Sequence, residues 1–366
     1  MTHRLIHISL LVVMLLMILN LGVFTFSTAL GNVSRLKLNE NYLTLPQLPL
    51  PSPQVIPSLP TQINPFGVMI PSQAFSDREK MQMAKDLGVR YYRPLSLFVD
   101  RWNGRCSECD AALNEGLKLV LTIRNGGGNG EPSYPPTNIP AFKLIISRVL
   151  ETYQPEVLVV ENEENSLTLF YSGTPEEYHA ELAAACEVAH EKNTKCTNGG
   201  LVSSLVAYLT AEQYREQGEP FKAREYLRRT LDPEEFIRYE KSPDSPRLQL
   251  QIRRGQELLA GYAQADADFV NFHWYIEDTD ALNEAVDYLE ETTGLPALTN
   301  EVGQQENENP LQVINTMKKI TQLDLPIAVW FSHDTEGFGG SRSLFNPDGT
   351  LRPNGIAFKE FIQQKF

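Results

Sequence analysis

Two apolar runs that lie far apart in this sequence each end in a glutamate. Val157–Val160 leads directly into Glu161-Asn-Glu-Glu-Asn165, and Pro296–Thr299 leads into Asn300-Glu301. Short apolar runs without polar alternation are typical of strands that are buried on both faces of a parallel sheet. The carboxyl ends of all strands in a parallel α/β barrel meet at one face, so we expect the two glutamates to lie together there. The pattern predicts both a scaffold and a two-carboxylate site.

Strand-like and helix-like segments alternate from Phe66 to the C-terminus. Helix start signals separate several of the apolar runs, among them the capping box Ser76-Asp-Arg-Glu79 and the segment Thr174-Pro-Glu-Glu177. The runs expected as strands are 66–70, 89–93, 117–123, 157–160, 196–201, 268–272, 296–299 and 327–331. Eight such strands predict an α/β fold, and a (β/α)8 TIM barrel rather than an open sheet.

One connection is much longer than the others. Residues 202–266, between the fifth and sixth expected strands, are rich in helix-forming residues. We expect a long helical insertion there. It either borders the substrate cleft or decorates the exterior of the barrel.

The N-terminal residues are expected to lie outside the barrel. No Asp, Glu, Lys or Arg occurs between Arg4 and Arg35. We interpret residues 1–31 as a secretory signal peptide or an uncleaved N-terminal membrane anchor. Residues 32–64 contain many prolines and are expected to form an extended linker. The catalytic domain is then 65–366, either secreted or tethered to the membrane.

The net charge limits the partners of this chain. A formal charge of −14 disfavours nucleic acids and anionic membrane surfaces, because both bind basic patches. It leaves neutral sugars open as ligands and mildly disfavours strongly anionic glycans.

Four cysteines are present, at positions 106, 109, 186 and 196. An even number in an exported chain favours disulfides, for which three pairings are possible. We expect Cys186 to pair with Cys196, joining a helix to the next strand, and Cys106 to pair locally with Cys109. A redox-active Cys-x-x-Cys is the alternative, and it would make the protein a thiol oxidoreductase. The long spacing of the second pair disfavours a zinc site.

Cleavage of a glycosidic bond requires an acid that protonates the leaving oxygen and a carboxylate that stabilises or attacks the developing cation. Glu163 and Glu301 are the candidates for these two roles. The histidines are scattered over different predicted elements, so we expect no metal site. The reaction requires no cofactor.

The segment Glu161-Asn-Glu-Glu-Asn165 resembles the Asn-Glu-Pro-Asn sequence that ends strand four in the clan A glycoside hydrolases. These enzymes are (β/α)8 barrels that act with retention of configuration. The resemblance implies that Glu163 is the acid/base and that Asn162 contacts the sugar 2-hydroxyl. Glu164 stands where the family commonly has proline, which adds a charge near the acid.

Further segments are similar to motifs of the same clan. Thr299-Asn-Glu-Val-Gly303 is similar to its strand-seven signature, which makes Glu301 the nucleophile. Phe272-His-Trp-Tyr275 is similar to its His-x-Tyr sequence at strand six. That likeness implies that His273 lines the sugar site and that Tyr275 donates a hydrogen bond to the nucleophile.

Two more residues take their expected roles from this resemblance. Arg93 matches the arginine that ends strand two and holds the nucleophile ionised. Trp330, which closes strand eight, would be the aromatic platform under the sugar ring.

These features predict a retaining glycoside hydrolase that cleaves an oligosaccharide, a polysaccharide or another glycoside by double displacement. A catalytically weak carbohydrate-binding barrel and a transglycosylase remain alternatives. A thiol oxidoreductase that uses Cys106 and Cys109 is a more remote one. The sequence does not specify the sugar, the linkage, endo or exo action, or the oligomeric state.

Overall fold

The structure is a computed structural model that describes residues 62–128, 130–304, 308–333 and 343–366. The chain divides into two units, Met1–Ser58 and Leu59–Phe366, and the described residues all belong to the second. The signal or anchor segment and most of the linker expected from the sequence therefore lie outside the described residues. Within the described ranges, no helix is both long enough and apolar enough to cross a membrane.

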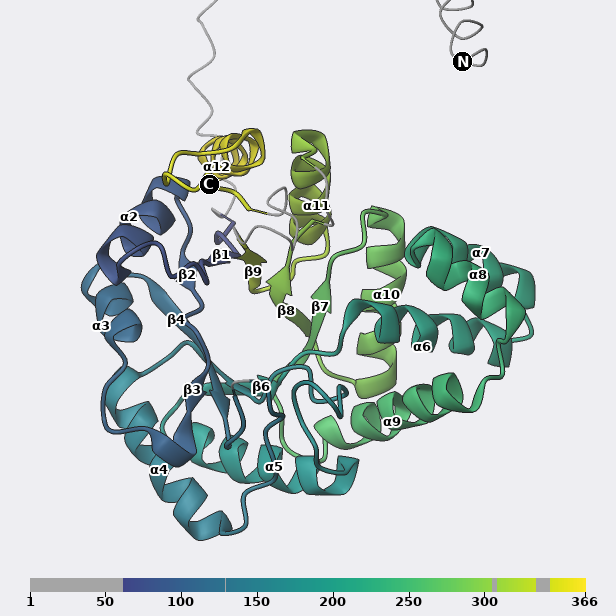
Figure 1. The fold of residues 1–366 in the computed structure, drawn as a ribbon, viewed down its shortest axis with the longest axis horizontal. Coiled ribbons are helices and arrows are strands. Elements are labelled where there is room, and N and C mark those ends of the chain that lie inside the picture. Colours follow the sequence, from purple (N-terminus) through teal and green to yellow (C-terminus); the bar gives the residue numbers. More distant parts are fainter. Residues whose placement is uncertain (1–61, 129, 305–307, 334–342) are drawn as a thin grey trace, which may run out of the picture. The chain divides into compact units, whose positions relative to one another are not determined.

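Eight parallel strands surround the centre of the described unit, in the order β6-β5-β4-β2-β1-β9-β8-β7 (Figure 1). Parallel bridges from Thr197 to Phe269 and from Leu201 to Phe272 join β6 to β7 and nearly close the ring. The bounds are β1 Phe66–Met69, β2 Tyr91–Tyr92, β4 Lys118–Arg124, β5 Val157–Val160, β6 Lys195–Asn198, β7 Val270–Trp274, β8 Ala297–Val302 and β9 Ala328–Phe331. The predicted (β/α)8 barrel is confirmed. A two-residue strand that the sequence did not predict, β3 (Leu97–Phe98), pairs with the end of β4.

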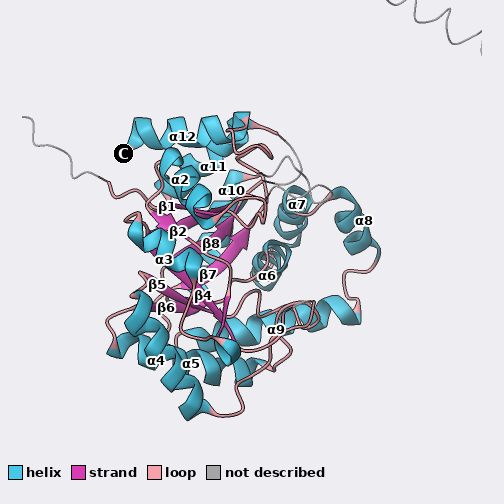
Figure 2. Cartoon of the chain, turned by 60° about the vertical axis from the view of Figure 1, so that its left-hand side comes forward, coloured by secondary structure: helices cyan, strands magenta, loops and turns pink. Residues whose placement is uncertain are grey.

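Helices cover the outside of the barrel (Figure 2). Both predicted capping boxes are present: Ser76 and Glu79 bond each other's backbone N–H groups, as do Thr174 and Glu177. The helices are α2 Asp77–Leu87, η1 Val99–Arg101, α3 Ser107–Asn114, α4 Ile139–Tyr153, α5 Pro175–Glu191, α6 Ser203–Glu216, α7 Pro220–Thr230, α8 Pro233–Lys241, α9 Pro246–Tyr262, α10 Thr279–Thr293, α11 Pro310–Gln322 and α12 Pro353–Lys365.

The strands are buried on both faces, which explains their continuous apolar sequences. Val157 and Val159 of β5 belong to a small cluster inside the barrel, together with Leu298 and Val329. Leu158 and its alternating neighbours point outward into the larger core between barrel and helices. Successive side chains of a strand face opposite sides, so one apolar run serves both cores.

The long insertion is helical, as predicted, and it divides into two parts. Helix α9 packs against both α5 and α10, and so takes the place of the ring helix that follows β6. Helix α6 packs against α9, α10 and β7, and α7 and α8 lie beyond it, farthest from the barrel (Figure 1). The insertion is thus partly a member of the helical ring and partly a projection from it.

Both expected disulfides are present. Cys186 of α5 bonds Cys196 of β6, and Cys106 bonds Cys109 at the start of α3. The first bond closes a chain segment of ten residues and the second a segment of three.

We predict that replacing Cys186 and Cys196 together by alanine lowers the free energy of unfolding by about 3 kcal/mol. The estimate follows from the entropy that a ten-residue closed loop removes from the unfolded chain. Urea unfolding followed by circular dichroism provides the measurement. The matched control, Cys106→Ala with Cys109→Ala, opens a shorter loop and should cost less. Equal losses in the two variants would contradict the loop-length argument.

Candidate active site

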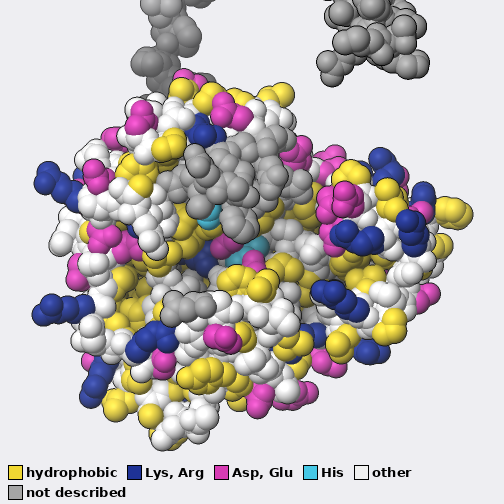
Figure 3. Space-filling view, viewed as in Figure 1, with side chains coloured by type: hydrophobic (Ala, Val, Ile, Leu, Met, Phe, Trp, Pro, Cys, Tyr) yellow, Lys and Arg dark blue, Asp and Glu magenta, His cyan; other side chains and the backbone are white. Residues whose placement is uncertain are grey.

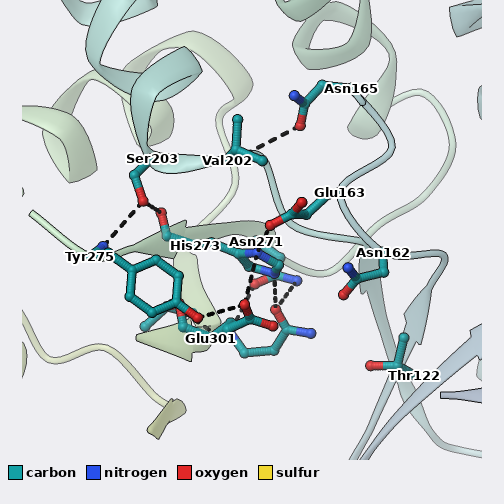
Figure 4. Close-up of polar contacts among 12 residues, drawn as sticks. Thr122, Asn162, Glu163, Asn165, Val202, Ser203, Asn271, His273, Tyr275 and Glu301 are labelled. Carbon is teal, nitrogen blue, oxygen red and sulfur yellow. Dashed lines mark hydrogen bonds and ion pairs between the residues drawn. The ribbon is translucent and has the colours of Figure 1, made fainter. Parts of the chain in front are cut away.

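Polar side chains from several strands meet at the carboxyl-terminal end of the barrel. Arg93 follows β2, Glu163 follows β5, His273 lies in β7 and Glu301 lies in β8. Figure 4 shows Glu163, His273 and Glu301 converging from these elements, and Figure 3 shows basic, acidic and histidine side chains gathered in a central hollow. The structure therefore brings together the two glutamates that the sequence singled out.

Glu301 is held as a carboxylate. The Tyr275 hydroxyl donates to Oε1 at 2.6 Å, and Arg93 Nη1 donates to Oε2 at 2.5 Å. Burial by itself would raise the pKa of Glu301, but the charges of His273 and Arg93 and these hydrogen bonds lower it to about 2. An ionised carboxylate of this kind is available to attack an electrophilic carbon.

Arg93 is buried, and its bonds tie several strand ends together. Nε donates to Thr122 Oγ1 at 3.2 Å, and Nη1 donates to the Asn300 carbonyl at 3.1 Å. Nη2 donates to Asn162 Oδ1 at 2.6 Å, which turns the amide nitrogen of Asn162 away from the arginine. A buried cation needs a paired anion and satisfied donors, and Arg93 has both. The pair with Glu301 is therefore part of the framework of this end of the barrel.

A bulge in β8 brings two adjacent side chains to the same end of the barrel. Leu298 of β8 lies opposite Asn271 of β7, but Glu301, three residues further along β8, lies opposite His273, only two residues further along β7. The register of β8 against β9 shifts in the same region. The Thr299 hydroxyl bonds both the N–H and the carbonyl of Glu301 across this irregularity. Strand neighbours normally point to opposite faces, but Asn300 and Glu301 both bond residues of this site. No local sequence pattern indicates this bulge.

The hydrogen bonds of His273 place a shared proton between this residue and Glu163. Asn271 is oriented by backbone groups, because the Asn300 N–H donates to its Oδ1 and its Nδ2 donates to the Asn198 carbonyl. Asn271 Nδ2 also donates to Asn300 Oδ1, so His273 Nε2, 3.0 Å from that oxygen, is a donor too. His273 Nδ1 lies 2.9 Å from Glu163 Oε1, and this contact requires a proton on one of the two atoms.

The surrounding carboxylates hold that proton in place. Burial of His273 opposes the imidazolium, but the negative charges of Glu301 and Glu163 outweigh it and raise the pKa of His273. Gly200 makes room for the ring, because a Cβ at this position would lie 2.4 Å from His273 Nε2. The asparagines at positions 198, 271 and 300, which no sequence pattern singled out as site residues, thus orient the ring that contacts Glu163. Their only sequence signal is a polar residue within or directly after an expected strand.

The backbone after β5 is unusual and directs Glu163. Glu161 and Glu163 have φ angles of 67° and 44°, in the left-handed region that residues other than glycine rarely occupy. Such conformations persist only where surrounding contacts enforce them, and they concentrate at functional sites. Here Glu163 is turned to His273, and Asn165 accepts a hydrogen bond from the Val202 N–H.

Glu164 does not place its side-chain charge at the mouth of the site. Its side chain is fully buried behind the strand end, where Asn198 Nδ2 and the Tyr262 hydroxyl both donate to Oε1. Arg254 donates to the Glu164 carbonyl. Burial raises the pKa of Glu164. The residue that departs from the family pattern therefore anchors the loop to α9.

Trp330 does not lie at the candidate site, contrary to the expectation from the family resemblance. Its side chain is fully buried and packs at a steep angle on Phe358 of α12, with ring centres 5.5 Å apart. It belongs to the core between barrel and helices, so it cannot form a platform under a ligand. Phe331, the next residue, packs with the interior of the barrel and lies 6.3 Å from the Tyr275 ring. The apolar face that the site presents from β9 is therefore Phe331.

Among the described residues, one group has the spacing of a metal site. Ligand atoms of Glu163, His273 and Glu301 lie within 4.8 Å of one another. Glu301 is already bonded to the Arg93 cation, and a second cation there would be repelled by it. This arrangement fits proton transfer and nucleophilic attack better than metal binding.

We predict that Glu301→Gln lowers the pKa of His273, because a nearby opposite charge is removed. A pH titration of the imidazole nitrogens by NMR provides the measurement. His190, which pairs with Asp266 and Asp268 away from the site, serves as the control in the same spectra. An unchanged pKa of His273 would show that its proton is held by something other than Glu301.

A second buried carboxyl pair lies beneath the site. Glu161 accepts the Asn125 N–H at 2.6 Å, and Glu181 accepts the Tyr171 hydroxyl at 2.9 Å. Both side chains are almost fully buried, and each affects the titration of the other. Burial raises the pKa of Glu161 to about 7, and burial together with the charge of Glu161 raises the pKa of Glu181 well above its usual range. At mildly acidic pH the folded protein holds protons here that the unfolded chain has lost.

We predict that Glu161→Gln flattens the pH dependence of stability between about pH 4.5 and pH 7. The folded pKa is raised, so the stability contributed by Glu161 is complete below pH 4.5 and is lost as the pH rises toward 7. Over this window the loss is roughly 3 kcal/mol. Urea unfolding at a series of pH values measures it. Glu187→Gln on the exposed side of α5 is the matched control, and a parallel profile for both variants would refute the assignment.

Comparison with known proteins gives similarity at the level of fold. No family model and no curated protein matches the sequence. The GH39 enzyme from Xanthomonas axonopodis pv. citri has a TM-score of 0.53 and 14% identity, over 83% of this chain and 67% of that one. An exo-beta-1,4-mannosidase from Opitutaceae bacterium strain TAV5 has a TM-score of 0.52 and 13% identity, over 82% of this chain and 59% of that one.

A glucosidase from Croceicoccus marinus has a TM-score of 0.51 and 12% identity, over 77% of this chain and 62% of that one. This chain thus spans about three fifths of the length of the glucosidase and of the mannosidase. At such identities the similarity establishes the barrel, and the reaction has to be argued from the site.

Proposed function

We propose that this protein is a retaining glycoside hydrolase, with Glu163 as the acid/base and Glu301 as the nucleophile. The observation that carries the proposal is the pairing of two glutamates in different settings on either side of His273. Glu301 is bonded to a cation and a hydroxyl, whereas Glu163 shares a proton with an imidazole. Two carboxyl groups with divided roles are what glycosidases require.

The short separation of the two groups supports retention of configuration. One carboxylate oxygen of Glu163 and one of Glu301 lie within 4.8 Å of each other. Retaining enzymes hold their carboxyl groups about 5–5.5 Å apart, whereas inverting enzymes leave about 6.5–9.5 Å for a water molecule. The geometry favours direct attack by Glu301. The fold similarity to a glucosidase and a mannosidase supports glycosidase activity in general.

The first step would form a covalent intermediate. A Glu301 oxygen attacks the anomeric carbon as the bond from that carbon to the leaving oxygen breaks. The one proton shared by Glu163 Oε1 and His273 Nδ1 passes through Glu163 to the departing oxygen, which leaves Glu163 as a carboxylate. Arg93 and Tyr275 orient the attacking carboxylate.

The second step would reverse these roles. Glu163, now a carboxylate, takes a proton from a water molecule, whose oxygen attacks the anomeric carbon. The ester bond to Glu301 breaks, and the sugar leaves with its original configuration. Asn162, positioned by its bond to Arg93, would donate its amide N–H to a sugar hydroxyl near the reacting carbon. The substrate class is an oligosaccharide, a polysaccharide or another glycoside.

We also infer that the enzyme works outside the cytoplasm. Two disulfides are typical of proteins that fold in an oxidising compartment, and residues 1–31 have the pattern of an export or anchor segment.

We predict that Glu301→Gln lowers kcat/KM on a hydrolysed aryl glycoside by a factor of about 10³ or more, because the nucleophile is lost. Glu163→Ala should slow the release of the glycosyl-enzyme by a factor of about 10²–10⁴, and azide should restore part of the rate by attacking the intermediate. A panel of aryl glycosides, with the anomer of the product read by NMR, provides the measurements.

Glu187→Gln, on the exposed side of α5, is the control that should keep full activity. A product of inverted configuration would refute the nucleophilic role of Glu301. Saturable sugar binding without turnover by the intact protein would favour a binding barrel instead. Products longer than the substrate would identify a transglycosylase.

A further inference from the structure

The insertion encloses a cavity that the reaction chemistry does not use. Helices α6, α8 and α9 surround a volume of about 650 Å³. Buried side chains of Leu205, Tyr208, Tyr239 and Leu248 line it. Pockets of several hundred Å³ with an apolar floor and a few polar groups are typical binding sites for small molecules and sugars.

The cavity begins next to the catalytic residues. Asn165, two residues after Glu163, lines it together with Val202, and the two are joined by a hydrogen bond of 3.2 Å. The neighbouring Ser203 bonds the backbone of two site residues, accepting from the Tyr275 N–H and donating to the His273 carbonyl. The first turn of α6 therefore contacts both the catalytic centre and the cavity.

The cavity also lies on a particular side of the catalytic centre. In Figure 4, Glu163 stands between Glu301 and the pair formed by Asn165 and Val202. The proposed acid protonates the leaving oxygen, so the group that departs lies on the Glu163 side of the reacting carbon. This step depends on the proposed function. It makes the insertion cavity a site for the leaving group rather than for the sugar that bonds Glu301.

The charge around the cavity is opposite in sign to that of the whole chain. Arg238, Lys241 and Arg247 border it, against one carboxylate, that of Glu235. In the part of the chain that the structure describes, no ion pair is found for Lys241 or Arg247. Glu235 accepts a hydrogen bond from the Tyr208 hydroxyl. Arg238 lies 4.0 Å from Glu234, so the cavity of a protein of formal charge −14 is bordered by one paired cation and by Lys241 and Arg247.

We propose that this cavity binds the leaving-group portion of the substrate, and that this portion carries a carboxylate or a sulfate group. The apolar floor would contact the face of a sugar ring or an aromatic ring, and the cations at the rim would bind the oxyanion. The overall acidity of the chain does not exclude such a substrate, because charged groups within about 8 Å dominate at physiological ionic strength.

The test compares two leaving groups on the same sugar. Glycosides of neutral 4-methylumbelliferone and of anionic 7-hydroxycoumarin-3-carboxylate are hydrolysed by the wild type and by the triple variant Arg238→Gln, Lys241→Gln and Arg247→Gln. We expect the triple variant to lose about tenfold in kcat/KM on the anionic glycoside, mainly through KM, and less than twofold on the neutral one. Comparing each substrate across the two proteins cancels the difference in leaving-group chemistry.

A second triple variant controls for net charge. Lys222→Gln, Arg224→Gln and Arg228→Gln remove the same charge from α7, where the side chains pair with acids outside the cavity. Equal losses with both triple variants, or equal losses on both glycosides, would overturn the proposal. Glycosides of a sulfated coumarin and of a carboxylated coumarin are compared in the same way, to show whether the cavity prefers a sulfate or a carboxylate.

A binding measurement separates this proposal from the catalytic one. Suppose that the wild type hydrolyses the neutral glycoside and that the first triple variant loses no more kcat/KM on the anionic glycoside than on the neutral one. This result refutes the cavity assignment and leaves the glycosidase proposal unaffected. If neither glycoside is hydrolysed, calorimetry with methyl glucuronoside, glucose 6-sulfate and methyl glucoside decides. Binding of an anionic sugar alone, lost in the first triple variant, supports the cavity assignment without the enzyme. No binding of either anionic sugar to the wild type overturns it.

Discussion

The ion pair between Arg93 and Glu301 is the interaction on which this end of the barrel depends. A buried guanidinium and a buried carboxylate are each costly, and each is acceptable only because the other is present. The remaining donors of Arg93 reach Thr122 on β4, Asn162 after β5 and the Asn300 carbonyl on β8. The residue that keeps the Glu301 carboxylate ionised therefore also fixes the relative positions of the strand ends. The fold and the proposed mechanism both require Arg93 at this position.

His273 links the two glutamates in a different way. Its Nε2–H donates to Asn300 Oδ1, and that oxygen is held in place because it also accepts from Asn271 Nδ2. The other ring nitrogen, Nδ1, is therefore the one that can share a proton with Glu163. The imidazole is also 3.7 Å from Glu301. Its charge therefore stabilises the nucleophile while its proton is available to the acid. A single buried ring thus contacts both carboxyl groups, at 2.9 Å from Glu163 and 3.7 Å from Glu301.

The sequence predicted the barrel well because its strands are buried on both faces, which produces apolar runs that few other structures require. It predicted which residues end the strands for the same reason. It did not predict which strand residues face the interior of the barrel and which face the helices, because a run such as 327–331 is apolar on both faces. Trp330 was therefore assigned to the site in place of Phe331. The β8 bulge depends on pairing with two neighbouring strands, and no local pattern encodes it. The roles of Asn198 and Asn271 arise only from contacts between distant segments.

Helix α9 has a consequence for how such a protein can diversify. It packs against α5 and α10, and α6 packs against β7, α9 and α10, so α9 and α6 together cover this side of the barrel. Changes in the length or sequence of α7 and α8 would alter the α8 side of the cavity while α6 and α9 keep the strands covered. On the proposed function, specificity and bond cleavage would then depend on different segments, and α8 is the natural segment to exchange when a new specificity is engineered.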